Sequence, residues 1–261
     1  MIPFKHLASR LKQRLRKKEL TVGSWLTIPH RSVVEVFAKS GFEWLVIDLE
    51  HAPIGIDQTA ELIAHIQGNG MQALVRVTKN EEVIIKRVLD AGADGIVVPM
   101  IKSKQEAEKA VSFTYYPPLG SRGVGLNRAQ HYGEGFESYK KWLNENIVII
   151  AQIEHIDAIE NLDEILAVKG IDGSIIGPYD LSGSMGYPGV YNRPDVKDAL
   201  QSYKTKVNGA NKPLGYHVIE SDASFSIEKI QEGYSLIAFS LDFFFLGDRA
   251  KLELKKINEL K

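Results

Sequence analysis

The sequence contains no cysteine, which excludes disulfide bonds, thiolate metal ligands and a cysteine nucleophile and is typical of the reducing cytoplasm. No segment approaches the roughly 18 continuous apolar residues that a membrane-spanning helix needs. An excess of one charge is also lacking, because 32 basic and 33 acidic residues give a formal net charge of −1. With 44% apolar residues over 261 positions, the chain can build a large core. We therefore expect a cytoplasmic globular protein that binds neither nucleic acid nor a membrane.

The amino-terminal segment, residues 4–18, is basic and carries Leu7, Leu11 and Leu15 at helical spacing. It lacks the apolar centre and cleavage site of a signal peptide. A basic amphipathic helix can lie on a membrane or dock on a partner. The simpler interpretation is an extra helix, within residues 1–19, that packs over one end of the domain.

The rest of the chain repeats one unit, a strand-like apolar run followed by a helical pattern. Strands are expected at residues 21–28, 44–50, 72–78, 95–101, 148–154, 172–178, 213–218 and 235–241. Helices are expected at residues 32–40, 57–67, 81–90, 103–114, 158–168, 194–207, 226–232 and 246–260. Eight β/α units in about 250 residues predict an α/β fold, a TIM (β/α)8 barrel that forms a single domain over residues 1–261.

A doubly wound open sheet is the alternative fold. The glycine-rich segment 120–125 follows a long connection rather than a strand, which disfavours dinucleotide binding. That connection, residues 115–146, is expected to be irregular, and loops of this length are often functional.

Two carboxylates follow apolar runs that are typical of strands buried on both faces. Glu154 ends the run that starts at Val148, and Asp180 follows the run that starts at Ser174. In a barrel the carboxyl ends of the strands meet on the catalytic face. Buried carboxylates need a compensating cation, proton or set of donors, and a hard ion such as Mg²⁺ or Mn²⁺ would suit this pair. Alternatively, Glu154 pairs with an arginine and Asp180 caps the next helix.

Further polar side chains are expected on the same face. Arg76, at the end of the third strand, could bind a carboxylate and stabilise an oxyanion, or form a structural ion pair with Asp48 or Glu50. His51 suits general acid–base work because its pKa lies near neutrality, and Asp48 and Glu50 are close enough to orient it. A structural role is the alternative for His51. Three other histidines are weaker candidates: His131, His155 and His217.

Lysine is missing from the interior of all eight predicted strands, and Lys79 and Lys102 lie just beyond strand ends. A Schiff-base aldolase built on a barrel needs a lysine inside the barrel. Covalent imine chemistry is therefore disfavoured.

Several segments together resemble the HpcH/HpaI family of metal-dependent (class II) pyruvate aldolases, of the 4-hydroxy-2-oxoheptanedioate aldolase type. The matching segments are 41–53 (GFEWLVIDLEHAP), 74–77 (LVRV), 98–100 (VPM), 116–118 (YPP), 121–125 (SRGVG), 152–154 (QIE) and 176–182 (IGPYDLS). The resemblance implies a barrel of the phosphoenolpyruvate/pyruvate type. It also implies a homohexamer, a trimer of dimers, in which the carboxy-terminal helical segment 243–261 is exchanged between subunits.

The resemblance assigns roles to individual residues. Glu154 and Asp180 are implied as ligands of a divalent metal, Mg²⁺ or Mn²⁺ with Co²⁺ or Zn²⁺ as alternatives. Arg76 is implied to contact the pyruvate oxygens, and His51 to be the acid–base residue with Asp48 as its partner. The implied substrate contacts are Gln152, Gly177, Pro178, Tyr179, Trp25 and Arg122.

The implied reaction is the reversible cleavage of a 4-hydroxy-2-oxo acid to pyruvate and an aldehyde through a metal-stabilised enolate. One alternative is a related enzyme acting on acyl-CoA or oxaloacetate, as citrate lyases and synthases do, and another is a non-catalytic carboxylate-binding barrel. The chain departs from the family pattern at Tyr179, at residues 54–56 and at residues 127–132. These positions lie where the aldehyde would bind, so the sequence does not define the aldehyde.

Overall fold

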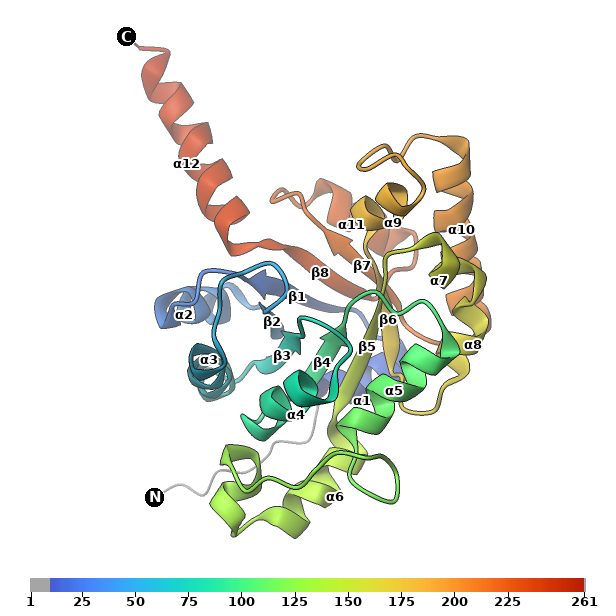
Figure 1. The fold of residues 1–261 in the computed structure, drawn as a ribbon. Coiled ribbons are helices and arrows are strands. Elements are labelled where there is room, and N and C mark those ends of the chain that lie inside the picture. The colour runs from blue at the N-terminus through green and yellow to red at the C-terminus, as the bar shows by residue number, and fades with distance from the viewer. Residues whose placement is uncertain (1–9, 261) are drawn as a thin grey trace.

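The structure is a computed structural model that describes residues 10–260. Residues 4–9 of the predicted amino-terminal helix, Leu7 among them, lie outside the described residues. Eight parallel strands form a closed barrel in which neighbours in sequence are paired and the last strand pairs with the first (Figure 1). The strands are β1 (Thr21–Leu26), β2 (Trp44–Asp48), β3 (Gln72–Arg76), β4 (Gly95–Val98), β5 (Val148–Ile153), β6 (Gly173–Ile176), β7 (Leu214–Val218) and β8 (Leu236–Leu241). The predicted barrel is confirmed, the open-sheet alternative is wrong, and none of these strands contains a lysine.

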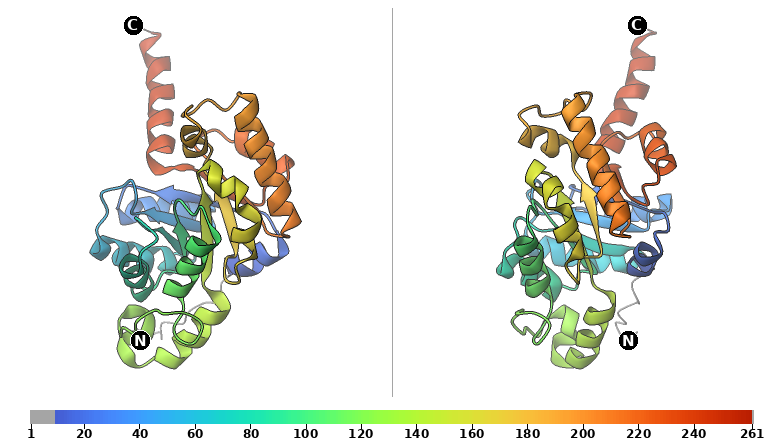
Figure 2. Two further views of the ribbon diagram at one scale, coloured as in Figure 1. Left: turned by 45° about the vertical axis from the view of Figure 1, so that its right-hand side comes forward. Right: turned by 90° about the vertical axis from the view of Figure 1, so that its right-hand side faces the viewer.

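Helices follow the strands and surround the barrel, as two further views show (Figure 2). They are α1 (Arg10–Lys17), α2 (Arg31–Ser40), α3 (Ile56–Gly68), α4 (Glu82–Asp90), α5 (Lys104–Thr114), α6 (Phe136–Asn146), α7 (Ile156–Glu160), α8 (Leu162–Ala167), α9 (Pro178–Ser184), α10 (Pro194–Gly209), α11 (Ser224–Gln231) and α12 (Asp242–Asn258), with a 3₁₀ helix, η1 (Arg128–Gly133). No helix within residues 10–260 is long and apolar enough to cross a membrane.

Two expectations for the helices need correction. The connection 115–146 is not irregular throughout, because it contains η1 and α6. Helix α6 buries Tyr139, Trp142 and Leu143 against the core. These residues stand at positions i, i+3 and i+4, a helical periodicity that is visible in the sequence. The helix predicted at 158–168 is two short helices, α7 and α8, which meet at Asn161.

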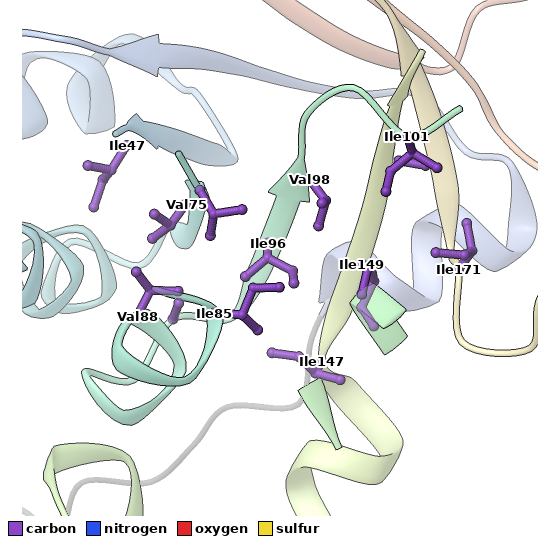
Figure 3. Close-up of a cluster of buried hydrophobic side chains, with 14 of the residues drawn as sticks. Ile47, Val75, Ile85, Val88, Ile96, Val98, Ile101, Ile147, Ile149 and Ile171 are labelled. Carbon is purple, nitrogen blue, oxygen red and sulfur yellow. The ribbon is translucent and has the colours of Figure 1, made fainter. Parts of the chain in front are cut away.

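The apolar core has two shells, one outside the barrel sheet and one inside it. Alternate side chains of the strands point outward and pack against the helices (Figure 3). The labelled members of this outer shell are Ile47, Val75, Ile85, Val88, Ile96, Val98, Ile101, Ile147, Ile149 and Ile171. The other side chains fill the barrel interior, and they include Trp25, Trp44, Val46, Leu74, Val97, Ile150 and Ala238.

Helix α1 closes the end of the barrel at which the strands begin. Its Leu11 and Leu15 are buried in the inner shell. Its Lys12 is buried too, and its Nζ donates to the carboxylate of Asp172, just before β6, at 3.1 Å. The expected packing of an extra helix over one end of the domain is thus observed for the described part of α1.

The carboxyl ends of the strands form the opposite end of the barrel. Asp48 and Arg76 are register partners on β2 and β3, so both side chains point into the barrel at the same level. Helix α12 starts at the end of β8 and projects away from the barrel (Figures 1 and 2).

Candidate active site

A cavity of about 600 Å³ opens at the carboxyl ends of the strands. It is lined by Thr27, Asp48, His51, Ala52, Pro53, Arg76, Gln152, Glu154, Gly177, Pro178, Tyr179, Asp180, His217, Ile219, Leu241, Phe243 and Phe244. The structure therefore brings together all the predicted site residues except Trp25 and Arg122. Residues from distant parts of the sequence meet here because parallel strands end on one face.

Arg76 and Asp48 form a bidentate ion pair inside the barrel. The Arg76 Nε donates to Asp48 Oδ1 at 2.9 Å, and Nη2 donates to Oδ2 at 2.7 Å. Burial alone would raise the pKa of Asp48, but the hydrogen bonds and charge of Arg76 hold it below its ordinary value. The ion pair between Arg76 and Asp48, which was the structural alternative to substrate binding, is thus present. Arg76 nevertheless lines the cavity.

The expected pairing of Asp48 with the ring of His51 is not observed. Asp48 instead accepts backbone hydrogen bonds from the amides of Glu50 and His51. The His51 ring is exposed to solvent and its Nε2 lies 3.7 Å from Glu50 Oε2. Glu50 also approaches Arg76 Nη1 at 3.4 Å. Burial raises the pKa of Glu50 above its ordinary value in spite of the positive charges of Arg76 and His51. Glu50, rather than Asp48, is thus the carboxylate nearest to the imidazole, without a hydrogen bond to it.

Glu154 is the most perturbed carboxylate of the cavity. It is 4% exposed, its Oε1 accepts from Gln152 Nε2 at 2.5 Å, and its Oε2 accepts from the Met100 amide at 3.3 Å. Burial, and then the negative charges of Asp180 and Glu50, raise the pKa of Glu154 to about 7. The charge of Arg76 and the hydrogen bond from the Met100 amide offset this rise only in part, so the cavity favours a proton or a cation at Glu154.

Asp180 belongs to the first turn of α9, where it is exposed and lines the cavity. No three His, Cys, Asp or Glu side chains converge as a metal-binding group within residues 10–260. The donor set is therefore two carboxylates, together with the buried Gln152 Oε1, which has no hydrogen-bond partner in the described part of the chain. Such an oxygen set fits a hard divalent cation that keeps water or substrate in its other positions. Glu154 and Asp180 are the residues that would hold it.

Gly177 allows this arrangement. A Cβ at this position would lie 3.0 Å from both Cγ and Oε1 of Glu154. A larger residue would push the carboxylate from its place. Tyr179, two residues further on, is 52% exposed at the rim of the cavity.

Two predicted substrate contacts need correction. Trp25 is fully buried beneath the cavity, where the Arg76 guanidinium stacks on its ring at 4.3 Å. Arg122 does not line the cavity. Its guanidinium donates to Asp90 at 2.5 Å and to Tyr139 Oη at 3.1 Å, and it lies over the ring of Tyr116. Arg122 thus ties the long connection to α4 and α6.

Sequence reasoning missed the side of the cavity that β7 and β8 form. Ile219, Leu241, Phe243 and Phe244 line it, together with His217, which was only a weaker candidate. The ends of both strands were predicted, but apolar residues there look like core residues. The other two weak candidates, His131 and His155, lie outside the cavity. His155 caps α7 by accepting from the Asp157 amide.

A closed β/α barrel with carboxylates and an arginine at the carboxyl ends of its strands is the arrangement of a barrel enzyme. The chain belongs to the HpcH/HpaI aldolase/citrate lyase family, whose profile matches residues 21–243. The predicted family is confirmed. The chain is 35% identical over 244 residues to the 2-keto-3-deoxy-L-rhamnonate aldolase of Escherichia coli K12, covering 93% of this chain and 90% of that protein.

Solved structures agree with this assignment. A family member from Burkholderia cenocepacia superimposes with a TM-score of 0.89 at 32% identity, covering 95% of this chain and 98% of that one. A citrate synthase, SbnG, superimposes with a TM-score of 0.84 at 28% identity, covering 95% and 97%. The likeness to the citrate lyase beta subunit of M. tuberculosis, at 13% identity, concerns the fold alone. The citrate lyases that match are therefore more distant from this chain than the aldolase is.

Proposed function

We propose that this protein is a class II pyruvate aldolase that reversibly cleaves a 4-hydroxy-2-oxo acid to pyruvate and an aldehyde. The observation that carries the proposal is the buried Glu154, with its raised pKa, in one cavity with Asp180 and Arg76. The family and the aldolase relatives support the same reaction.

A divalent cation held by Glu154 and Asp180 would supply Lewis-acid polarisation of the 2-oxo acid. Arg76 provides a fixed positive charge for the oxygen that becomes the enolate oxygen, and Asp48 holds the guanidinium in place. His51, polarised by Glu50, accepts the proton of the C4 hydroxyl. The C3–C4 bond then breaks, its electron pair passes into the enolate of pyruvate, and the aldehyde leaves. Protonation at C3 completes the reaction.

The substrate class follows from the chemistry of the relatives' substrate. A 2-keto-3-deoxy sugar acid is a 4-hydroxy-2-oxo acid, and its cleavage yields pyruvate and a hydroxyaldehyde. Mg²⁺ and Mn²⁺ are the preferred ions for a carboxylate set, with Co²⁺ and Zn²⁺ as alternatives.

The test is pyruvate release from a panel of 4-hydroxy-2-oxo acids, measured with each of these four ions. We expect activity that complete chelation abolishes and that metal restores. Arg76→Ala should lose it by about a hundredfold or more, whereas Arg87→Ala, on α4, should retain it. Full activity after chelation, or in Arg76→Ala, would refute the proposal.

A condensing enzyme is the second candidate, favoured by the 28% identity to a citrate synthase. Arg76 and the carboxylates would serve the same enolate chemistry with oxaloacetate or an acyl-CoA. Turnover of these compounds without pyruvate release from any 4-hydroxy-2-oxo acid would establish this candidate in place of the aldolase.

The protein is further proposed to be a cytoplasmic homohexamer in which α12 packs on a second copy of the chain. Support comes from the projection of α12 and from its exposed Leu246, Leu252, Leu254 and Ile257. An apolar groove of about 620 Å³ between α2 and α12 is available for packing. Light scattering should give the mass of six chains, and Leu254→Lys should give a smaller species. A monomeric parent protein at micromolar concentration would refute this assembly.

A further inference from the structure

A second cavity, of about 700 Å³, lies at the end of the barrel where the strands begin. It is bounded by α1, α5 and α6 and by the segments that precede β6 and β7. None of its described lining residues lines the active-site cavity, and the side chains of the inner shell fill the barrel between the two. The proposed reaction therefore leaves this cavity without a role.

The charges in this cavity are unbalanced. Asp172 is the sole carboxylate among the described lining residues, whereas four side chains are cationic: Lys12, Arg16, Lys169 and Lys212. Asp172 already pairs with Lys12, at 3.1 Å. The other three cations form no ion pair within residues 10–260. An anionic ligand would therefore meet up to three uncompensated positive charges.

Two of these cations lie close to the buried ion pair. Burial lowers the pKa of Lys12, and the pairing with Asp172 opposes this effect. The charges of Arg16 and Lys212 lower the pKa of Lys12 further. Both cations are therefore near enough to act on the same ammonium group. The Lys212 Nζ also donates to the Ile171 carbonyl at 2.6 Å, which fixes it beside the segment that precedes β6.

The hydroxyl of Tyr115 supplies a neutral donor at the same place. Tyr115 follows α5, is 7% exposed and lines the cavity. Burial and then the charge of Asp172 raise its pKa, and Arg16 opposes them, so the phenol keeps its proton at physiological pH. Its hydroxyl makes no hydrogen bond to the described part of the chain. A buried hydroxyl without a partner is costly, so a ligand oxygen that accepts from it is favoured.

The remaining surface of the cavity is largely apolar. It includes Leu15, Val111, Leu119 and Pro213. A volume of about 700 Å³ is far larger than an inorganic ion and is typical of sites for small organic molecules. The ligand that fits thus joins a doubly charged anionic group to an apolar body.

We propose that this cavity binds a phosphate monoester, whose phosphate lies between Arg16, Lys212 and the Tyr115 hydroxyl and whose body packs on the apolar side chains. A phosphate offers three acceptor oxygens for these donors. The bound ligand would join α1 to α5 and to the segment that precedes β7, and it would stabilise the closed end of the barrel. This binding site is separate from the proposed aldolase function and goes beyond it.

The test is a calorimetric titration of the metal-free protein, in EDTA, with phenyl phosphate. Inorganic phosphate, which lacks the apolar body, and phenol, which lacks the charge, are the comparison ligands. We expect phenyl phosphate to bind at least about tenfold more tightly than either. Phenyl phosphate should also raise the melting temperature of the protein, and added salt should weaken its binding.

Arg16→Met and Lys212→Met should each weaken the binding of phenyl phosphate about tenfold or more, and Tyr115→Phe about three- to tenfold. Lys141→Met, which changes an exposed lysine of α6 outside the cavity, is the matched control and should bind as the parent does. Arg76→Ala should also bind normally, because its guanidinium belongs to the active site.

Arg16 is exposed, so Arg16→Met should leave the fold intact even if the partly buried Lys212 is needed for it. Absence of binding to the parent at millimolar concentration, or equal affinity in the parent, Arg16→Met and Tyr115→Phe, would overturn the proposal. Loss of binding in Arg76→Ala would put the ligand in the active site and overturn it too. The titration uses neither metal nor substrate, so its failure would not touch the proposed aldolase function. Conversely, an absence of pyruvate release with phenyl phosphate still bound would overturn only that function.

Discussion

Glu154 should destabilise the metal-free protein at pH values above about 7. The structure raises its pKa from 4.5 to about 7, so the folded protein binds this proton more tightly than the unfolded chain. The stability that this group contributes is fully present below pH 4.5 and is lost as the pH rises through about 7. The difference corresponds to about 3 kcal/mol of unfolding free energy.

Glu154→Gln removes the titration and keeps the shape of the side chain. The Met100 amide, which donates to Glu154 Oε2, loses its acceptor at a cost of about 1 kcal/mol. Relative to the parent in EDTA, the variant should be slightly less stable at pH 5 and about 2 kcal/mol more stable at pH 8. In a protein of this size the melting temperature of the variant relative to the parent should rise by about 5–10 °C from pH 5 to pH 8.

The assay is thermal and urea denaturation from pH 5 to 8, with and without Mn²⁺. Glu61→Gln, an exposed carboxylate on α3, is the control and should show no pH-dependent difference from the parent. Mn²⁺ at pH 8 should stabilise the parent and not Glu154→Gln. If the difference in unfolding free energy between Glu154→Gln and the parent did not change with pH, the raised pKa of Glu154 would be wrong.

Three further changes test other parts of the structure. Gly177→Ala should weaken metal binding about tenfold or more in a calorimetric titration, because a Cβ would lie 3.0 Å from Glu154 Oε1. Gly183→Ala is the control and should bind metal normally, because the nearest atom to its Cβ would lie at 3.7 Å. An equal loss of affinity in both variants would argue against the steric cause. Asp48→Asn should raise KM for pyruvate about ten- to a hundredfold, since Arg76 loses its bidentate acceptor, and an unchanged KM would contradict that role. Lys12→Met should cost about 3 kcal/mol in urea denaturation, because the partly buried Asp172 loses its ion-pair partner. The double variant Lys12→Met, Asp172→Asn should regain part of this stability, and no recovery would show that the lost ion pair is not the cause.

The strands and half of the cavity could be predicted because their determinants are local. A continuous β-branched run predicts a buried strand wherever it lies in the chain. The run that ends at Ile153 therefore predicts both β5 and the place of Glu154. The barrel then brings the strand ends together without further information.

The remaining features depend on contacts between distant segments. Arg122 was assigned to the substrate from its motif, but its position depends on Asp90 and Tyr139, which no periodicity relates to it. The family resemblance pairs Asp48 with His51, which is its neighbour in sequence, whereas the barrel register places Asp48 beside Arg76. Phe243 could not be separated from core residues, because an apolar side chain gives the same signal in a core and in a cavity.

Helix α1 has a consequence for the order of steps in turnover. Because Leu11 and Leu15 seal the barrel interior at the far end, substrate and both products share one entrance. The proposed pyruvate site, at Arg76 and Glu154, is deep, whereas the rim carries Tyr179, which is half-exposed. The aldehyde must therefore depart before pyruvate, and pyruvate must enter first in the synthetic direction. Pyruvate should accordingly inhibit cleavage competitively and the aldehyde noncompetitively, because a barrel that is filled with side chains and closed by α1 leaves a single way in and out.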